Sequence, residues 1–376
     1  STKSTLSWED IMPQLYVIGE KLRWSWGVVS HLNAVCNSSE LREVHSNQQP
    51  KIVRFSNQLA QNEVIFKALS NLKEHGNIKD ETQLRIIETE LITMKNKGIG
   101  LEINERTLFN SRSERLAELS TTFSNNVLDA TKNWSLLLKN HSEVEGLPER
   151  ALETLALAAT QAGDKTTEGE NNPSAANGPW RVGLDLPRYI PFQTYAKDRS
   201  VREKVYKAFV SRASDGELNN KKIIEEILDL RSKQARQLGY KNWCEISLST
   251  KMADNEEAVE TLLEELRLAA MPHAEKEIIQ LRECAKRNGE NDNFELSPWD
   301  LSFWAEVLRK EKYDLDQEKL RPWFPLDQVL NGLFNLCKRL FEIEIQEAKD
   351  IAPLWHQDVR FFNVKNLNGH KIASFY

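Results

Sequence analysis

Apolar residues recur three and four positions apart along most of the chain, the spacing of helices with one buried face. One such pattern predicts a helix from about residue 106 to residue 140, and its last apolar residues are Leu137 and Leu138. A second begins at Asn219 and ends at Gly239, a residue suited to a left-handed helix end. These patterns predict long helices, each with one face directed towards a core.

A third helical pattern covers residues 254–289. Asp254 and Glu257 stand three residues apart, as in a capping box, and Pro272 is expected to bend the helix. The spacing predicts that one face of this helix is buried. Four apolar side chains form that face: Val259, Leu262, Leu263 and Leu266.

Two further helices are predicted to begin with a proline in the first turn, at Pro298 and at Pro325. The pattern then changes, because residues 359–364 and 371–376 are strand-like and the Asn-Gly pair at 368–369 between them favours a hairpin turn. The sequence therefore predicts a mainly α fold with a small β-hairpin at its C-terminal end.

The segment GDKTTEGENNPSAANGP at 163–179 has no large apolar residue and predicts a flexible loop. We therefore expect an N-terminal helical lobe, this loop, a second helical region and the hairpin, at 1–162, 163–179, 180–357 and 358–376. A two-stranded hairpin alone is only marginally stable in water. Because the chain ends within the second strand, we expect the sheet to continue beyond it.

Composition narrows the classes of function. The chain has 56 acidic and 50 basic residues and a net charge of −6, with no basic stripe, which argues against a nucleic-acid partner. It has no apolar run long enough for a membrane span, so we expect a soluble, cytoplasmic protein without a membrane partner. The four cysteines never form a CxxC pair, and we expect reduced thiols in the core.

Candidate chemistry in the chain is sparse. Seven histidines are present, but none belongs to an HExxH motif, the helical zinc site of many peptidases. His273 and Glu277 are four residues apart, and an ordinary helical side-chain contact is the favoured interpretation. His356 and Asp358 have no nucleophile motif nearby, which favours a structural hydrogen bond, and GIG at 98–100 favours a turn. The residues predict neither a complete catalytic constellation nor a transition-metal site.

Several ordered segments nevertheless carry a resemblance, which is clearest from residue 187 onwards. These segments are PRYIPF (187–192), LGYKNW (238–243), STKMA (249–253), LRPWFP (320–325), WHQDVRFF (355–362) and SFY (374–376), with FSNNVLDAT (123–131) as the best earlier match. They resemble the thimet oligopeptidase and oligopeptidase A family of zinc metallopeptidases. Small departures are Gln357, where proline is usual, and Ala373, where glycine is usual.

The resemblance implies a nearly all-helical, two-lobed, channel-forming molecule that cleaves short peptides with zinc-activated water. The family's zinc ligands, an HExxH helix and a further glutamate, lie C-terminal to the matched region. The resemblance therefore implies that this chain is the N-terminal portion of a zinc-dependent oligopeptidase, that zinc is not bound by this chain, and that the chain alone is inactive. No catalytic residue and no metal ligand is predicted here.

The resemblance also implies partners and one binding site. The expected partners are short peptide substrates and the missing C-terminal catalytic portion. Phe375 and Tyr376 are the predicted substrate-binding residues, because the final strand would lie near the sheet that edges the active site. An alternative is a non-catalytic helical module that binds peptides or a protein, and a third is a helical scaffold without a peptide function.

Overall fold

The computed structural model describes residues 6–76, 78–166, 172–315 and 317–376. Within these residues it contains fourteen α-helices and five short strands, which confirms the mainly α fold. The chain divides into two compact units. Unit 1 consists of Ser1–Ser30 and Ser38–Leu308, and unit 2 consists of His31–Asn37 and Arg309–Tyr376. No helix in the described part of the chain meets the length and apolarity needed to cross a membrane.

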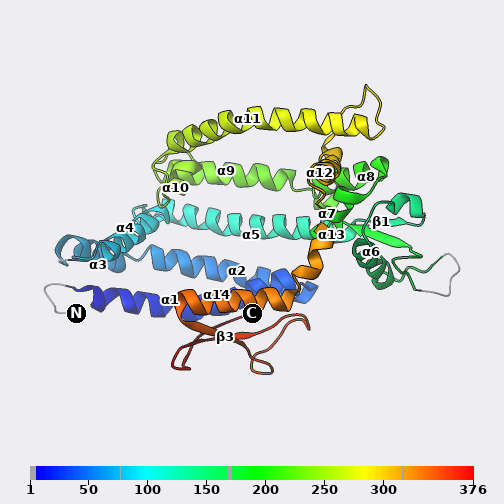
Figure 1. Cartoon of the computed structure of the whole chain (residues 1–376). Helices are drawn as coiled ribbons and strands as arrows, with labels where there is room; N and C mark the ends of the chain where they lie inside the picture. Colours follow the sequence, from blue (N-terminus) through cyan, green and yellow to red (C-terminus); the bar gives the residue numbers. More distant parts are fainter. Residues whose placement is uncertain (1–5, 77, 167–171, 316) are drawn as a thin grey trace. The chain divides into compact units, whose positions relative to one another are not determined.

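Twelve helices lie wholly or mainly in unit 1. They are α1 (Trp8–Val35), α2 (Ser39–Ala60), α3 (Glu63–His75), α4 (Glu81–Asn96), α5 (Ile103–Asn133), α6 (Glu149–Gln161), α7 (Leu186–Tyr195), α8 (Arg199–Val210), α9 (Lys221–Gln237), α10 (Trp243–Leu248), α11 (Glu256–Arg287) and α12 (Pro298–Tyr313), with 3-10 turns η1 (His141–Val144) and η2 (Gly216–Leu218). The long helices α2, α5, α9 and α11 run roughly parallel to one another in that order (Figure 1).

The best-packed core of unit 1 surrounds a two-stranded sheet. Strand β1 (Ser135–Leu138) pairs antiparallel with β2 (Trp180–Gly183), so that Leu138 lies opposite Trp180. Trp180 and Phe192 are fully buried in this cluster, together with Leu155 from before the 163–179 segment. Residues from both sides of that segment therefore share one core.

The domain boundaries at residues 162, 179 and 357 stay predictions. Of the expected loop, residues 167–171 lie outside the described residues. Its described parts contain neither a helix nor a strand, and they have one isolated bridge between Ser174 and Gly178.

The expectation that the helix before this core continues to residue 140 was wrong. Helix α5 ends at Asn133, Trp134 is extended with φ −92° and ψ 131°, and the two leucines that follow belong to β1. Leu138 is only 1% exposed because β2 and the core cover it. Burial by strand pairing outweighs the helical spacing of these leucines.

Other predicted helix ends are close to those observed. Helix α9 ends at Gln237 and Gly239 has φ +82°, as expected of a left-handed end. Helix α12 begins at Pro298. The predicted cap of α11 was wrong by one residue, because the side chain of Asn255, not Asp254, accepts a hydrogen bond from the Ala258 amide.

The predicted burial of the first half of α11 was also wrong. Leu262, Leu263 and Leu266 are 56%, 59% and 58% exposed. The spacing of these residues is correct for a helix with one apolar face, but no described residue covers that face. A sequence pattern shows which side chains share a face and leaves open what packs against it.

Unit 2 contains the C-terminal sheet. Its elements after α12 are α13 (Gln317–Leu320), the 3-10 turn η3 (Arg321–Trp323), α14 (Leu326–Phe341), β3 (Ile343–Glu347), β4 (Phe362–Asn366) and β5 (Lys371–Phe375). The predicted hairpin is confirmed as β4 and β5, with Gly369 at φ +79° in the turn. Strand β3, which the sequence pattern did not predict, pairs antiparallel with β4.

The cysteines are free thiols, but the expectation that they lie in the core was only partly correct. Cys284 is buried and Cys337 is half-buried, whereas Cys36 and Cys244 are exposed. Cys36 donates a hydrogen bond from Sγ to the carbonyl oxygen of Trp355 within unit 2.

Candidate functional site

One face of the central strand β4 is buried. Phe362 and Val364 of β4 are 6% and 9% exposed, and the ring of Phe334 on α14 lies 5.3 Å from the ring of Phe362. Because side chains alternate along a strand, these two residues of β4 point to the same side. Helix α14 thus provides the cover that a small sheet needs to be stable.

The last strand, β5, is an edge of this sheet. The strand order is β3-β4-β5, and among the described residues no strand pairs with the outer edge of β5. All five of its residues are exposed. Unpaired N–H and C=O groups on such an edge can form a ladder with an extended peptide. β5 therefore has the backbone geometry for adding one more strand.

Phe375 and Tyr376, the two predicted substrate-binding residues, lie at the end of this edge. The Phe375 ring stacks on Phe362 at 5.2 Å with an interplanar angle of 18°. The Tyr376 hydroxyl donates a hydrogen bond to the Pro353 carbonyl oxygen at 3.1 Å, and its ring lies 4.9 Å from the ring of Trp355. Both residues contact the sheet and remain 40% and 48% exposed, and their role in binding stays a prediction.

Ion pairs hold the segments around the sheet. Arg360 donates to both carboxylate oxygens of Glu347 on β3, at 3.1 and 2.7 Å, and to Asp327 of α14 at 3.0 Å. The hydrogen bond from Arg360 lowers the pKa of Glu347 below its usual value. These ion pairs connect the segment between β3 and β4 to β3 and to α14.

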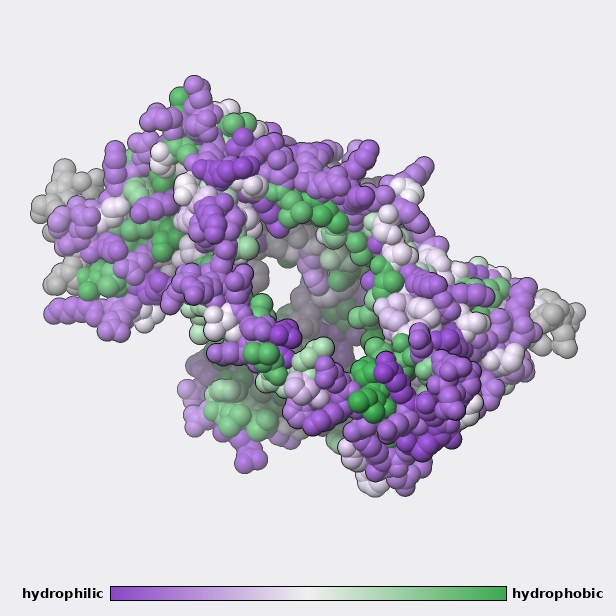
Figure 2. Space-filling model, turned by 90° about the horizontal axis from the view of Figure 1, so that it is seen from above, coloured by the Kyte–Doolittle hydropathy of each residue, from purple (hydrophilic) through white to green (hydrophobic). Residues whose placement is uncertain are grey.

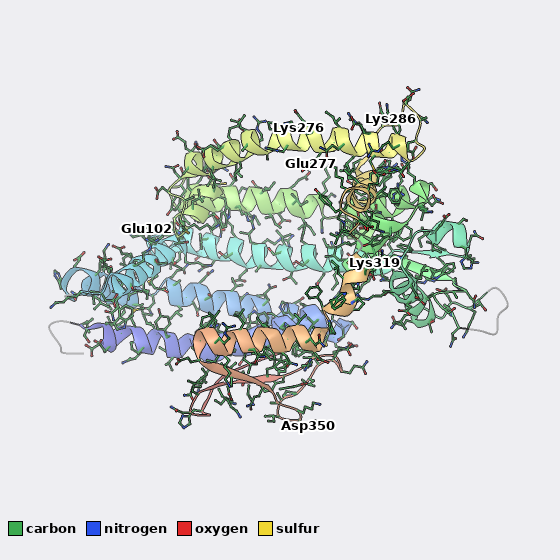
Figure 3. The ribbon with its side chains drawn as sticks, viewed as in Figure 1. Glu102, Lys276, Glu277, Lys286, Lys319 and Asp350 are labelled. Carbon is green, nitrogen blue, oxygen red and sulfur yellow. The ribbon has the colours of Figure 1, made fainter. Side chains whose placement is uncertain are left out.

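The other candidate pairs do not form reactive arrangements. The Asp358 amide donates to Nδ1 of His356 at 3.2 Å, and the Asp358 carboxylate lies 3.6 Å from the same nitrogen, with both side chains exposed. His273 and Glu277 are both exposed on α11. Figure 3 shows Glu277 on the side of α11 that faces α9 and Lys276 on the side away from it. GIG at 98–100 forms a turn with Gly98 at φ +85°.

Unit 1 also contains a buried ion-pair cluster around Asp300 that the sequence did not predict. Asp300 of α12 is fully buried and accepts hydrogen bonds from Arg202 at 3.0 Å and from Arg199 at 2.7 Å. Arg202 is itself 2% exposed, and its guanidinium lies 4.2 Å from the centre of the Phe303 ring. Burial raises the pKa of Asp300, but hydrogen bonds from Arg199, the Ser297 amide and Arg202 outweigh it and lower that pKa. Asp300 and Arg202 are closed to solvent, whereas the Arg199 side chain is 42% exposed, and the buried pair fastens α8 to α12.

The described residues offer no set of ligands that fits a zinc ion. The residues that the structure describes contain no group of three or more His, Cys, Asp or Glu side chains placed to hold a metal ion. Structural zinc sites need four protein ligands and catalytic sites need three.

Comparisons with known proteins decide the family. Residues 192–376 match the model of peptidase family M3, and residues 2–106 match that of the neurolysin/thimet oligopeptidase N-terminal domain. The chain is 41% identical over 372 residues to organellar oligopeptidase A, chloroplastic/mitochondrial, of Arabidopsis thaliana, an alignment that covers 98% of this chain and 46% of the relative. The chain belongs to the thimet oligopeptidase and oligopeptidase A family of zinc metallopeptidases.

Bacterial relatives align with the chain over a similar range. Oligopeptidase A of Escherichia coli (strain K12) is 37% identical over 377 residues, which are 98% of this chain and 53% of the relative. Dipeptidyl carboxypeptidase of the same organism is 26% identical over 362 residues, 95% of this chain and 51% of the relative. The chain spans about half the length of the curated relatives that it matches.

Proposed function

We propose that this chain is the N-terminal portion of a zinc-dependent oligopeptidase, that it helps to bind short peptides, and that it does not hydrolyse them alone. One observation carries the proposal. The chain aligns over 98% of its length with about half of each oligopeptidase A relative, yet it contains no HExxH motif. Its part in catalysis is then to help bind and orient the substrate, while the zinc chemistry belongs to the remainder of the polypeptide.

The edge of β5 supports the peptide-binding part of this proposal. An extended substrate that pairs with β5 forms hydrogen bonds through its backbone, so it is recognised with little dependence on its side chains. Phe375 and Tyr376 then contact the substrate beside that ladder. This mode selects extended peptides over folded proteins, because a folded protein has few free strand edges to offer.

Peptide hydrolysis provides the test. The purified 376-residue chain and a polypeptide that continues with the sequence encoded after Tyr376 are incubated with the same quenched fluorescent peptide, with added zinc and with a chelator. We expect turnover that is sensitive to the chelator from the longer polypeptide and none from the 376-residue chain. Turnover by the 376-residue chain that a chelator abolishes would contradict the proposal.

The same open edge favours one alternative, a non-catalytic module that binds peptides or a protein. That function requires a reading frame that stops after Tyr376 and a peptide that binds to the isolated chain with measurable affinity. A reading frame that continues into an HExxH motif excludes it.

A further inference from the structure

Four asparagines in the chain are followed directly by glycine, in the pairs at 177–178, 288–289, 331–332 and 368–369. In such a pair the backbone nitrogen of the glycine can attack the side-chain carbonyl carbon of the asparagine, because glycine has no Cβ to hinder the approach. The attack converts the amide to a cyclic imide and then, with water, to an acid. The surroundings of each pair decide whether it reacts.

Exposure does not separate the four pairs, because all four asparagines are exposed. The surface seen in Figure 2 is mostly hydrophilic, and exposed polar residues are common on it. The reaction has two further requirements. The side-chain amide must be free to turn towards the backbone, and the backbone around the glycine must be free to change its dihedral angles.

Helices hold two of the four pairs. The pair at 331–332 lies inside α14, so the reaction there requires helical backbone hydrogen bonds to open. Asn288 is the C-terminal cap of α11, and its Nδ2 donates a hydrogen bond to the Cys284 carbonyl oxygen at 2.9 Å. The side-chain amide of Asn288 is therefore tied to the end of the helix.

Core packing holds the pair at 177–178. Gly178 is buried, and a Cβ at this position would lie 2.8 Å from the Trp180 ring. Trp180 is fully buried in the core cluster around the β1–β2 sheet. A change of the backbone dihedral angles beside Asn177 would therefore disturb a closely packed core, which resists such shifts.

The pair at 368–369 is the least restrained. It lies in the β4–β5 turn, where Gly369 has φ +79° and nothing lies within 4 Å of a Cβ added to it. Among the described residues, none forms a hydrogen bond with the Asn368 side chain. The Gly369 amide donates to the Asn366 carbonyl oxygen at 2.9 Å. The reaction thus requires one exposed turn to open, rather than a helix or a core.

Asn366 provides an internal comparison within the same turn. It is followed by Leu367, whose Cβ hinders attack by the backbone nitrogen. Its Oδ1 accepts a hydrogen bond from the His370 amide at 3.0 Å, so its side chain is held. Asn366 and Asn368 share one hairpin and one solvent environment, and they differ in the two properties that the reaction needs.

We propose that Asn368 is a site of spontaneous deamidation. The Gly369 nitrogen forms a bond to Cγ of Asn368, the bond from Cγ to Nδ2 breaks, and Nδ2 leaves as ammonia with the proton of the Gly369 amide. Water then cleaves one of the two imide C–N bonds. Cleavage at Cγ gives aspartate, and cleavage at the main-chain carbonyl gives isoaspartate, in which the main chain runs through Cβ and Cγ.

Isoaspartate at residue 368 changes the start of β5. It adds one main-chain atom and one carboxylate to the turn. The His370 carbonyl oxygen accepts from the Asn366 amide at 2.9 Å, and the His370 amide donates to the Asn366 side chain. A longer turn displaces His370 and weakens both bonds. The modification is independent of the proposed function, whereas an effect on peptide pairing at the β5 edge rests on it.

Peptide mapping tests the site. The 376-residue chain is incubated in mildly alkaline buffer, because the attacking nitrogen must lose its proton, and the digest is analysed by mass spectrometry. Isoaspartyl methyltransferase then identifies isoaspartate. We expect Asn368 to convert several times faster than the asparagines of the other three pairs, and Asn366 to stay unchanged. Equal rates at the four pairs, or faster conversion at another pair, would overturn the proposal.

The same chain unfolded in urea is the control for sequence alone. There the four pairs should convert at similar rates, because the restraints of helix and core are gone. A pair at 368–369 that converts in urea but not in the folded chain would show that the turn protects it, which also overturns the proposal. These measurements need no peptidase activity, so their outcome does not depend on the proposed function.

Two variants test the effect on β5. Asn368→Gln blocks the reaction, because a longer side chain would have to close a six-membered ring, and Asn331→Gln is the matched control within α14. After incubation, we expect faster hydrogen exchange at the first amides of β5 in the unchanged chain and in Asn331→Gln, but not in Asn368→Gln. Unaltered exchange in a chain that carries isoaspartate at 368 would contradict the predicted loosening of β5.

Discussion

Helix α6, which packs in the core around Trp180, and the first half of α11 both carry apolar residues three and four positions apart, but only the apolar face of α6 is covered. Leu155 on α6 is 2% exposed, because β2 and α7 pack against it. Leu263 on α11 is 59% exposed. The comparison teaches that apolar spacing predicts a face reliably, while burial depends on a partner that the spacing does not specify.

The charged groups of the two regions also differ in burial. Asp300 and Arg202, which border the Trp180 core, are buried and hydrogen-bonded to one another. Glu264 and Arg267 of α11 form an exposed ion pair. Buried charges must be paired because desolvation is costly, whereas exposed pairs contribute little. The following changes should separate the two regions.

The largest effect is expected at Asp300. Asp300→Ala leaves Arg202 buried without its carboxylate, which should lower the free energy of unfolding by about 3–5 kcal/mol. The control is Asp292→Ala, because the Asp292 side chain is 96% exposed and its pair with Lys286 should contribute about 0–1 kcal/mol. Urea unfolding followed by tryptophan fluorescence measures both. Equal, small losses for the two variants would contradict the view that the cluster fastens α8 to α12.

The second largest effect is expected at Leu155, compared with Leu263. Leu155→Ala should lower the free energy of unfolding by about 2–5 kcal/mol, because it opens a cavity in a packed core. Leu263→Ala in the 376-residue chain should change it by no more than about 0.5 kcal/mol, as is usual for exposed positions. The same urea titration compares them. A large loss for Leu263→Ala would show that α11 is covered within this chain.

Alanine substitutions at two glycines with positive φ distinguish the cost of a steric clash from the cost of backbone strain alone. Gly163→Ala should cost about 1–2 kcal/mol for the left-handed conformation alone, because nothing lies within 4 Å of the added Cβ. Gly146→Ala should cost more, because its Cβ would lie 2.4 Å from the Tyr195 carbonyl oxygen. Thermal unfolding ranks the two, and an equal cost would mean that the Tyr195 backbone moves aside freely.

The smallest effect is a pH dependence at His45. Its ring stacks on Trp26 at 4.6 Å and is 6% exposed, and burial lowers its pKa below the usual 6.5. The neutral ring is therefore favoured in the folded state. Its contribution to stability is complete above pH 6.5 and is lost as the pH falls below 6.5 through the folded-state pKa.

His45→Phe keeps the stacking and removes the titration. Between pH 7.5 and 5.5, the Tm of the unchanged protein should fall more than the Tm of this variant. Parallel curves would show that His45 accepts a proton in the folded state without penalty.

Much of the fold could be predicted from local signals. The ends of α9 and α12 depend on a glycine and a proline, whose backbone preferences act within a few residues. The β4–β5 hairpin depends on an Asn-Gly pair that suits its turn. The family could also be recognised, because its motifs are contiguous in sequence.

The remaining features depend on contacts between distant residues. Leu137 and Leu138 are strand residues only because β2 pairs with them, and β3 was missed because its partner β4 follows fifteen residues after its end. The Arg202–Asp300 pair joins residues 98 positions apart. For the candidate site, the place of the final strand near a binding edge followed from the family resemblance, whereas the packing of Tyr376 against Pro353 could not be anticipated.

Zinc retention tests the central claim most directly. The 376-residue chain is equilibrated with zinc, dialysed against metal-free buffer and analysed for bound metal, beside a polypeptide that continues past Tyr376. We predict that the longer polypeptide retains one zinc ion per chain and that the 376-residue chain retains none. One tightly held zinc ion per 376-residue chain would contradict the claim that the zinc site lies outside these residues.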